Sequence, residues 1–301
     1  MELRALEYFV AVADAGGFSR AARLLGVAQP ALSRQVRALE VELRQNLLLR
    51  NGRGAETTEA GRRLLAHARG ILHQVERARR ELDDVKDEPV GHVVIGLPPS
   101  FARVLSAPIV RDFRQRFPRA SVAIVEGLST SIHEGVVLGR VDVGMLYNPV
   151  PSPAIDLQPL FDEDLCLIVP RGTARAGATT RLRDLPGYPL IIPSRLHAIR
   201  TLVEARLAGL GLKPQVALEV DAIGAILELV AEGHGFAVLS PRALQIAEAG
   251  RRLVARPIVQ PRLRIALALA VSSQRPATPL QAACVDLVAG LAAKGRSGAP
   301  R

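Results

Sequence analysis

Residues 18–40, "FSRAARLLGVAQPALSRQVRALE", predict two short helices with almost no chain between them. Ser19 is suited to cap the start of the first helix, and Gly26 is suited to end it. The second helix begins at Ala28-Gln29-Pro30, because a proline in the first turn costs no helical hydrogen bond, and it continues to about Leu43. Two helices joined this closely favour a helix-turn-helix unit.

The second of these helices separates its side chains onto two faces. Its apolar positions are Ala31, Leu32, Val36 and Leu39. Positions 29, 33 and 37 are four apart and therefore share the other face, with Arg34 beside them. Arginine can pair with guanine, glutamine with adenine, and serine with a base or a phosphate. We expect this face to enter the DNA major groove, and an ordinary solvated helix face is the alternative. The expected DNA-binding residues are Gln29, Pro30, Ser33, Arg34 and Arg37.

Residues 46–58, "NLLLRNGRGAETT", carry two glycines close together and predict a short hairpin or wing. Arg50 and Arg53 flank the Asn51-Gly52 turn of this wing. Arginines at such a position are suited to phosphates or to a narrow minor groove. Both therefore belong to the expected DNA interface.

A long helix is predicted next, from a cap at Thr58 to a stop at Pro89. Its apolar residues are spaced alternately four and three apart, which is the a/d repeat of a coiled coil. We expect a helix of about 45 Å, at 1.5 Å per residue, that pairs with a second copy of the chain. The expected dimerisation residues are Leu64, Ala68, Ile71, Val75, Ala78 and Leu82. An amphipathic helix that packs on its own domain is the alternative.

From Val90 onward, strands alternate with helices, which is typical of α/β units around mostly parallel sheets. Apolar runs predict strands at 92–97, 121–127, 141–147, 165–169, 190–194, 217–220, 235–240 and 262–271, with helices near 102–116, 131–139, 198–209, 223–232 and 242–249. A segment of this length indicates two lobes with a cleft between them. The expected domains are residues 1–58, 59–89 and 90–295, with lobe I at about 90–164 and 266–295, lobe II at about 165–265, and a tail at 296–301.

Charge and cysteine content limit the other classes of function. The net charge is +10, yet residues 1–88 contain 15 basic and 13 acidic side chains, so most of the excess lies outside the predicted DNA-binding segment. Cys166 and Cys284 lie far apart and fit buried thiols in a reducing cytosol. The histidines show no metal-ligand spacing, and no run reaches the ~18 apolar residues of a membrane span. We expect a soluble, cytoplasmic protein that has no metal or cofactor and is not an enzyme.

The chain resembles the LysR-type transcriptional regulators over essentially its full length. The resemblance is carried by "LRALEYFVAVADAGGFSRAARLLGVAQPALSRQVRALEVEL", "LLLRNGRGAETTEAGRRLL", "GHVVIGLPPS", "VLGRVDVGML" and "VAEGHGFAVLS". It implies a winged helix-turn-helix, a linker helix and a two-lobe effector-binding domain of the periplasmic-binding-protein type. It also implies binding to promoter DNA as a homodimer or tetramer, and it leaves a contact with RNA polymerase open. Within the family, "RNGRG" and "IIPSRLHAIR" resemble the nitrogen assimilation control group.

The resemblance also implies a small-molecule effector between the lobes, at strand ends and helix starts. The matching effector-binding residues are Pro99, Ser100, Ser129, Thr130, Ser131, Ser194, Arg195, His197 and Gly235. Hydroxyls and N–H groups at helix starts favour an anion, and Arg195 is suited to hold a carboxylate, so we expect an anionic metabolite. The alternatives are plain helix caps and, for Arg195, a salt bridge between the lobes.

Two classes of function are compatible with these features. The first is a sequence-specific regulator whose DNA binding or bending depends on a metabolite, with an effector-independent regulator of the same fold as its variant. The second is a two-lobe solute-binding protein or enzyme whose helical module only dimerises. The polar face around Arg34 discriminates between them, because only the regulator needs it to contact DNA.

Overall fold

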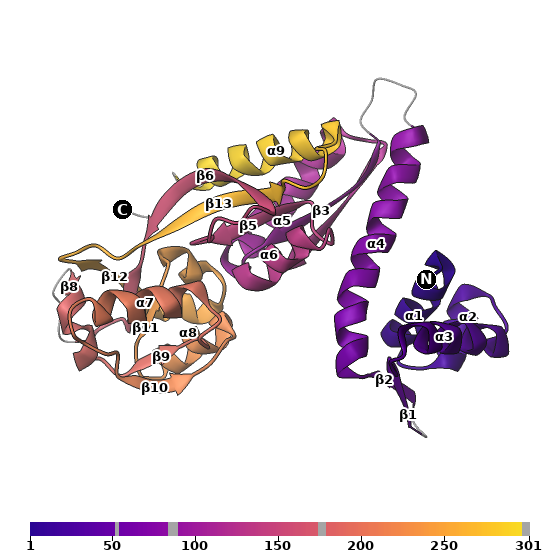
Figure 1. The fold of residues 1–301 in the computed structure, drawn as a ribbon. Coiled ribbons are helices and arrows are strands. Elements are labelled where there is room, and N and C mark those ends of the chain that lie inside the picture. The colour runs from indigo at the N-terminus through magenta and orange to yellow at the C-terminus, as the bar shows by residue number, and fades with distance from the viewer. Residues whose placement is uncertain (52–53, 84–89, 174–178, 297–301) are drawn as a thin grey trace. The chain divides into compact units, whose positions relative to one another are not determined.

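The computed structural model describes residues 1–51, 54–83, 90–173 and 179–296 (Figure 1). By their internal contacts they form two compact units. The first unit comprises residues 1–87 with 138–140, and the second comprises the rest of the chain. The side chains of Arg50 and Leu82, all of Arg53 and the end of the predicted tail lie outside the described residues.

The first unit contains three short helices, a two-stranded wing and one long helix (Figure 1). The helices are α1 (Leu3–Ala15), α2 (Phe18–Leu25), α3 (Gln29–Leu43) and α4 (Glu59–Asp83), and the wing is the antiparallel pair β1 (Leu48–Asn51) and β2 (Gly54–Thr57). These elements confirm the predicted helix-turn-helix and wing. The predicted cap at Ser19 is wrong, because α2 begins at Phe18 and places Ser19 inside its first turn.

Glycines end the first two helices of this unit. Gly16 and Gly26 take φ values of 64° and 65°, a left-handed conformation that glycine adopts without steric cost. The helices can therefore turn sharply and pack around one apolar core. The core side chains that are at most 1% exposed include Leu6, Phe9, Val12, Leu32, Val36 and Leu39. Burial of each large side chain contributes roughly 1.5–3 kcal/mol, so the core fixes which face of α3 points outward.

The second unit begins with a five-stranded sheet in the order β4-β3-β5-β13-β6. Its strands are β3 (Gly91–Leu97), β4 (Ala120–Glu126), β5 (Val143–Tyr147), β6 (Ile155–Asp164) and β13 (Arg264–Ser272). The helices of this lobe are α5 (Pro99–Arg116), α6 (Ser129–Val137) and α9 (Pro279–Arg296). Side chains of β3 alternate between the two faces: Ile95 packs in the core that contains α5 and α9, whereas Val94 packs with α6.

A second lobe follows β6 and is built on two smaller sheets. One has the order β11-β7-β12-β8, and the other pairs β10 with β9 in parallel. Its strands are β7 (Cys166–Pro170), β8 (Thr180–Arg181), β9 (Leu190–Ile192), β10 (Val216–Glu219), β11 (Ala237–Leu239) and β12 (Leu253–Val259). Its helices are α7 (Ala198–Ala208) and α8 (Ile223–Ala231), with 3-10 helices η1 (Leu182–Gly187), η2 (Pro241–Gln245) and η3 (Glu248–Arg252).

The predicted α/β alternation is confirmed, with corrections to its detail. Strands β6 and β12 and helix α9 were not predicted, and the helix expected at 242–249 is divided between η2 and η3. The two larger sheets are mixed rather than mostly parallel, because β13 is antiparallel to β5 and β6 and β7 is antiparallel to β11 and β12. Among the described helices, none combines the length and the apolar character needed to cross a membrane.

Candidate DNA interface and ligand pocket

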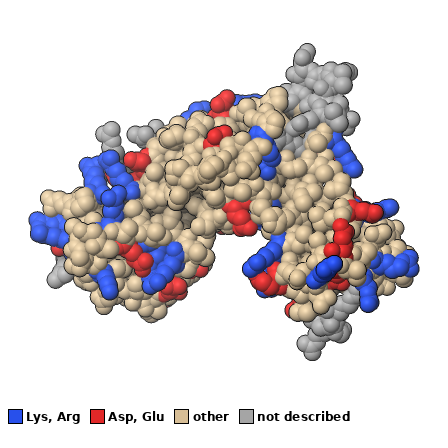
Figure 2. Space-filling view, viewed as in Figure 1, with Lys and Arg blue, Asp and Glu red and all other residues tan. Residues whose placement is uncertain are grey.

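The polar face predicted on α3 points away from the core. Gln29, Pro30, Arg34 and Arg37 are exposed and Ser33 is half-buried, whereas Leu32 and Val36 on the opposite face are fully buried. The first turn has no side-chain cap, because Ala28 occupies the capping position. The lack of a polar cap costs about 1 kcal/mol. In the space-filling view, acidic side chains lie among basic ones over this unit (Figure 2).

The wing is held against α3 by one carboxylate. Glu40, in the second half of α3, accepts the backbone N–H groups of Leu47 at 2.9 Å and Leu48 at 3.1 Å through the same Oε1 atom. On the other side of the wing, the N–H of Ala55 donates to the carbonyl of Gly16 at 3.0 Å. The wing is therefore fixed to both ends of the helix-turn-helix. Sequence analysis did not predict this role for Glu40.

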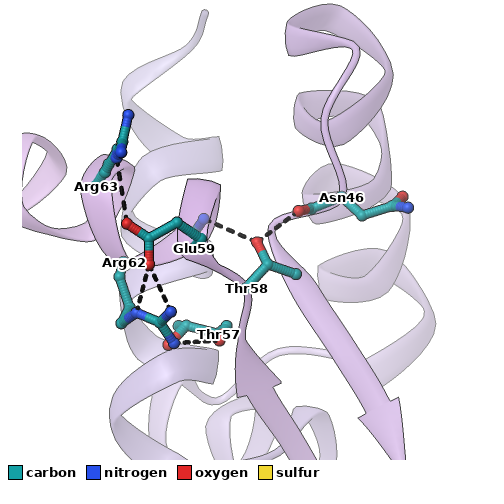
Figure 3. Close-up of polar contacts among 7 residues, drawn as sticks. Asn46, Thr57, Thr58, Glu59, Arg62 and Arg63 are labelled. Atoms are coloured by element: carbon teal, nitrogen blue, oxygen red, sulfur yellow. Dashed lines mark hydrogen bonds and ion pairs between the residues drawn. The ribbon is translucent and has the colours of Figure 1, made fainter.

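Thr58 joins the wing to α4, as predicted (Figure 3). Its hydroxyl donates to the carbonyl of Asn46 at 2.6 Å and accepts the N–H of Gly61 at 2.9 Å, which caps α4. Gly61 itself lies against the wing, because a Cβ there would come within 2.0 Å of the carbonyl oxygen of Leu47. In the first turn of α4, a side-chain hydrogen bond from Arg62 lowers the pKa of Glu59.

The predicted dimerisation residues divide into two groups along α4. Ala68 is fully buried in the core of its own unit, and Leu64 packs against the same core. Ile71 is 37% exposed, Val75 is half-buried and Ala78 is exposed. Ala68 is therefore occupied within its own unit, and Ile71 is the most exposed large apolar residue among the described seam positions. An ion pair between Arg69 and Asp14 further ties α4 to α1.

A pocket lies in the second unit, where the starts of its helices converge. It encloses about 440 Å³ of empty space, including its open mouth. Its lining residues are Pro98, Pro99, Ser100, Gly127, Leu128, Ser129, Tyr147, His197, Ala198, Ile199, Ile223, Leu239, Ser240 and Ala243. They include the first residues of α5, α6, α7 and α8. Each helix start carries a partial positive charge and N–H groups without a helical partner, so the pocket is suited to a negatively charged or acceptor-rich group.

Hydrogen bonds orient the polar side chains of this pocket. Ser129 Oγ accepts the N–H of Tyr147 at 2.9 Å, and Ser240 Oγ accepts the N–H of Arg242 at 3.2 Å. His197 Nδ1 accepts the N–H of Ile199 at 3.2 Å and thereby caps α7. Burial lowers the pKa of His197, although the charge of Asp221 acts in the opposite direction. The imidazole is therefore neutral near pH 7.

Behind the pocket wall lies a buried charged pair that connects the two lobes. Arg242 of η2 donates to Glu163 of β6 at 2.6 Å, and both side chains are 9% exposed. The hydroxyl of Tyr147 lies 3.0 Å from both Glu163 Oε2 and Ser100 Oγ. Burial, followed by the charge of Glu163, raises the pKa of Tyr147 well above its ordinary value. The lining residues that the structure describes include no Lys, Arg, Asp or Glu.

The structure brings some of the predicted effector residues together and separates others. Pro99, Ser100, Ser129 and His197 line the pocket, whereas Thr130, Ser131, Ser194, Arg195 and Gly235 are not among its lining residues. Thr130, Ser131 and Arg195 are exposed, and the N–H of Ser194 donates to Asp221 at 2.8 Å. Tyr147 and Ser240 were not predicted, although both stand at the carboxyl end of a predicted strand, where ligands of α/β folds bind.

In the described part of the chain, no group of three or more His, Cys, Asp and Glu side chains is arranged to hold a metal ion. Both cysteines are buried, Cys166 in β7 and Cys284 in α9. The α3 face with its wing and the pocket of the second unit are therefore the two candidate functional sites.

Comparison with known proteins links both sites to one family. Residues 3–62 match the family described as "Bacterial regulatory helix-turn-helix protein, lysR family", and residues 86–293 match "LysR substrate binding domain". The nitrogen assimilation regulatory protein nac of Klebsiella aerogenes is 33% identical over 98% of this chain and 96% of its own length, and that of Escherichia coli (strain K12) is 32% identical over 96% and 94%.

Solved structures agree over the whole chain. CbnR, a LysR family transcriptional regulator, is similar with a TM-score of 0.71 and 26% identity over 100% of both chains. Full-length BenM is similar with a TM-score of 0.61 and 27% identity, over 100% of this chain and 99% of its own. The two nac proteins are named as regulatory proteins of nitrogen assimilation, which confirms the expectation of a regulator rather than an enzyme, as well as the resemblance to the nitrogen assimilation control group. The chain belongs to the LysR family of DNA-binding transcriptional regulators.

Proposed function

We propose that this regulator recognises a specific DNA site through the outer face of α3 and the wing, and that a small anionic metabolite in the pocket modulates the binding or the bend of that DNA. LysR regulators bind DNA and small-molecule effectors and form oligomers. The single observation that carries the DNA proposal is the outward position of Gln29, Arg34 and Arg37 on a helix whose other face is buried. A similar protein, CbnR, has been solved with its target DNA, at a TM-score of 0.56 and 28% identity.

We propose that two chains pair through the second half of α4, where Ile71, Val75 and Ala78 lie in the predicted repeat. Two symmetric recognition helices would then face two half-sites of the DNA. Replacement of Ile71 by Glu is expected to shift the chain towards monomer in sedimentation experiments. The matched change of exposed His67 to Glu is expected to leave the oligomeric state unchanged.

An anionic effector is supported by the convergence of four helix starts on the pocket and by the lack of acidic side chains among its described lining residues. Such a ligand can change DNA binding only if its affinity differs between two arrangements of the protein. The Arg242–Glu163 contact between the lobes is one interaction that such an arrangement would alter. We therefore place the coupling between pocket and DNA in the packing of the two lobes.

Footprinting on the DNA upstream of the protein's own gene tests this function. The account predicts a protected region that spans several helical turns and changes in length or in bend when an organic acid occupies the pocket. A footprint that no member of a panel of organic acids alters would favour the effector-independent variant. A protein that protects no DNA while it turns over a substrate would favour the alternative of an enzyme with a dimerisation module.

We further propose that the protein acts in the cytoplasm, where bacterial promoters lie, and contacts RNA polymerase from its bound site. Transcription in vitro with purified polymerase tests this contact. Activation from a promoter whose polymerase site does not overlap the footprint supports it. Repression limited to overlapping sites would contradict it.

A further inference from the structure

The protons of the buried polar network behind the pocket can be assigned one by one. Glu163 is paired with Arg242 at 2.6 Å, so its carboxylate only accepts hydrogen bonds. The phenol of Tyr147 keeps its single proton, because burial raises its pKa. That proton is donated to Glu163 Oε2 at 3.0 Å. The phenol oxygen is then left to accept from the other group that it contacts, Ser100 Oγ at 3.0 Å.

This assignment determines what Ser100 offers to the pocket. A serine hydroxyl has one proton and two lone pairs. Because the proton of Ser100 is donated to Tyr147, the side chain presents only lone pairs to a ligand. Ser100 is 5% exposed, so a ligand that reaches it leaves little room for water to supply a missing hydrogen bond.

Three other polar side chains of the pocket can act as hydrogen-bond donors. Ser129 and Ser240 each accept a backbone N–H with one lone pair, so each hydroxyl can still donate its proton to a ligand. His197 accepts the N–H of Ile199 through Nδ1, so its neutral ring carries the proton on Nε2. The pocket therefore combines three side chains that can donate, and the starts of four helices, with Ser100, whose own proton is already donated and which can only accept.

We propose that the pocket takes a small hydroxycarboxylic acid. Its carboxylate accepts from His197, Ser129 and Ser240, and its hydroxyl donates to Ser100. Glu163 and Arg242 are positioning residues in this scheme, because they determine the direction of the Tyr147 hydroxyl and through it the polarity of Ser100. The proposal rests on the proposed function of this pocket as the effector site and adds the chemical class of its ligand.

Pairs of acids of equal size test whether Ser100 accepts a hydrogen bond from the ligand. Isothermal titration of the full chain would compare lactate with pyruvate and 2-hydroxybutyrate with 2-oxobutyrate. In each pair the oxygen at the second carbon either carries a proton or does not. We expect the hydroxy acid to bind about tenfold more tightly than the oxo acid, because the oxo acid leaves the buried acceptor of Ser100 unpaired.

Three variants show whether the preference comes from the accepting role of Ser100 or only from the shape of the pocket. Tyr147→Phe lets Ser100 donate its proton to the ligand, so the oxo acids should gain affinity and the preference should fall to nearly one. Ser100→Ala should also remove the preference, because the hydroxy acids lose their acceptor and the oxo acids no longer leave a buried acceptor unpaired. Ser106→Ala is the matched control on the same helix, because Ser106 bonds to the carbonyl of Ala102 and does not line the pocket. It should keep the preference, and thermal unfolding confirms that each variant is folded.

The outcomes also separate this inference from the proposed function. If both acids of each pair bound equally, the accepting role assigned to Ser100 would be overturned. The same would follow if Tyr147→Phe did not move the preference towards the oxo acids. In both cases the pocket would remain an effector site. Absence of binding by all four probes would overturn the hydroxycarboxylic class. If other organic acids changed the footprint, the proposed control of DNA binding by an effector would stand in both cases.

Discussion

Glu40 in α3 accepts the backbone N–H of Leu47 at the start of the wing, at 2.9 Å. The same oxygen accepts the N–H of Leu48, and the backbone carbonyl of Glu40 accepts the N–H of Gln45 at 3.0 Å. Glu40 therefore accepts three backbone N–H groups from the segment that follows α3, two through its carboxylate and one through its carbonyl. Glu40 is therefore one of the residues that fix the wing to α3.

Replacement of Glu40 by Ala should therefore weaken both folding and DNA binding. Two backbone N–H groups lose a charged acceptor, at a cost of about 1–3 kcal/mol, and the wing loosens. Glu40→Gln keeps one acceptor and should lie between Glu40→Ala and the parent in both measurements. Thermal unfolding and fluorescence anisotropy with operator DNA provide the readouts. Glu42→Ala is the control, because Glu42 is bonded to the exposed N-terminus. If Glu40→Ala kept the stability and the affinity of the parent, the role of Glu40 would be contradicted.

Gly61 should tolerate no side chain. A Cβ at this position would lie 2.0 Å from the carbonyl oxygen of Leu47, so Gly61→Ala must push α4 away from the wing. We expect a loss of about 1–3 kcal/mol of unfolding free energy. Gly290→Ala in the middle of α9, where an added Cβ meets nothing within 4 Å, should instead stabilise by about 0.5–1 kcal/mol. Denaturant unfolding of both variants measures these opposite signs, and a neutral Gly61→Ala would refute the close contact.

The two thiols should be inert in the folded protein. Burial is the first cause that raises the pKa of both Cys166 and Cys284 to about 12, so neither forms a thiolate near neutral pH. A thiol reagent such as Ellman's reagent should react with neither side chain in buffer at pH 8 and with both in denaturant. Rapid reaction of the native protein would show that one thiol is accessible and reactive.

His197 should make stability depend on pH. Burial lowers its pKa below the ordinary 6.5, so the unfolded chain binds this proton more readily than the folded chain does. The contribution of neutral His197 is complete above about pH 6.5 and is lost as the pH falls towards the folded pKa. His197→Asn keeps a capping side chain without the titration, and should flatten the fall in melting temperature between pH 7.5 and 5. His67→Asn, at an exposed position of α4, should leave this fall in melting temperature unchanged. If the melting temperature of His197→Asn fell as steeply as that of the parent, the pH dependence would come from another group.

The sequence predicts the local elements of this protein better than its contacts. Leu32, Val36 and Leu39 recur at helical spacing, which is enough to orient Gln29 and Arg34 outward. The role of Ala68 could not be predicted in this way, because the same a/d spacing serves a partner helix and the core of its own domain. Tyr147 and Ser240 lie far apart in the sequence, at the ends of strands from two different sheets, and line one pocket only in the folded chain. Arg242 and Glu163, likewise, come from different lobes.

Anisotropy titration of Arg34→Ala tests the central claim, that the outer face of α3 reads DNA. The parent and the variant are titrated against a duplex from the footprinted region and against a scrambled duplex of the same length. Arg111→Ala in α5 serves as the control, since Arg111 is paired with Asp112 in the other unit. The account predicts that Arg34→Ala loses about 1–3 kcal/mol of binding to the specific duplex and much of its preference over the scrambled one. Unchanged affinity and unchanged preference in this variant would contradict it.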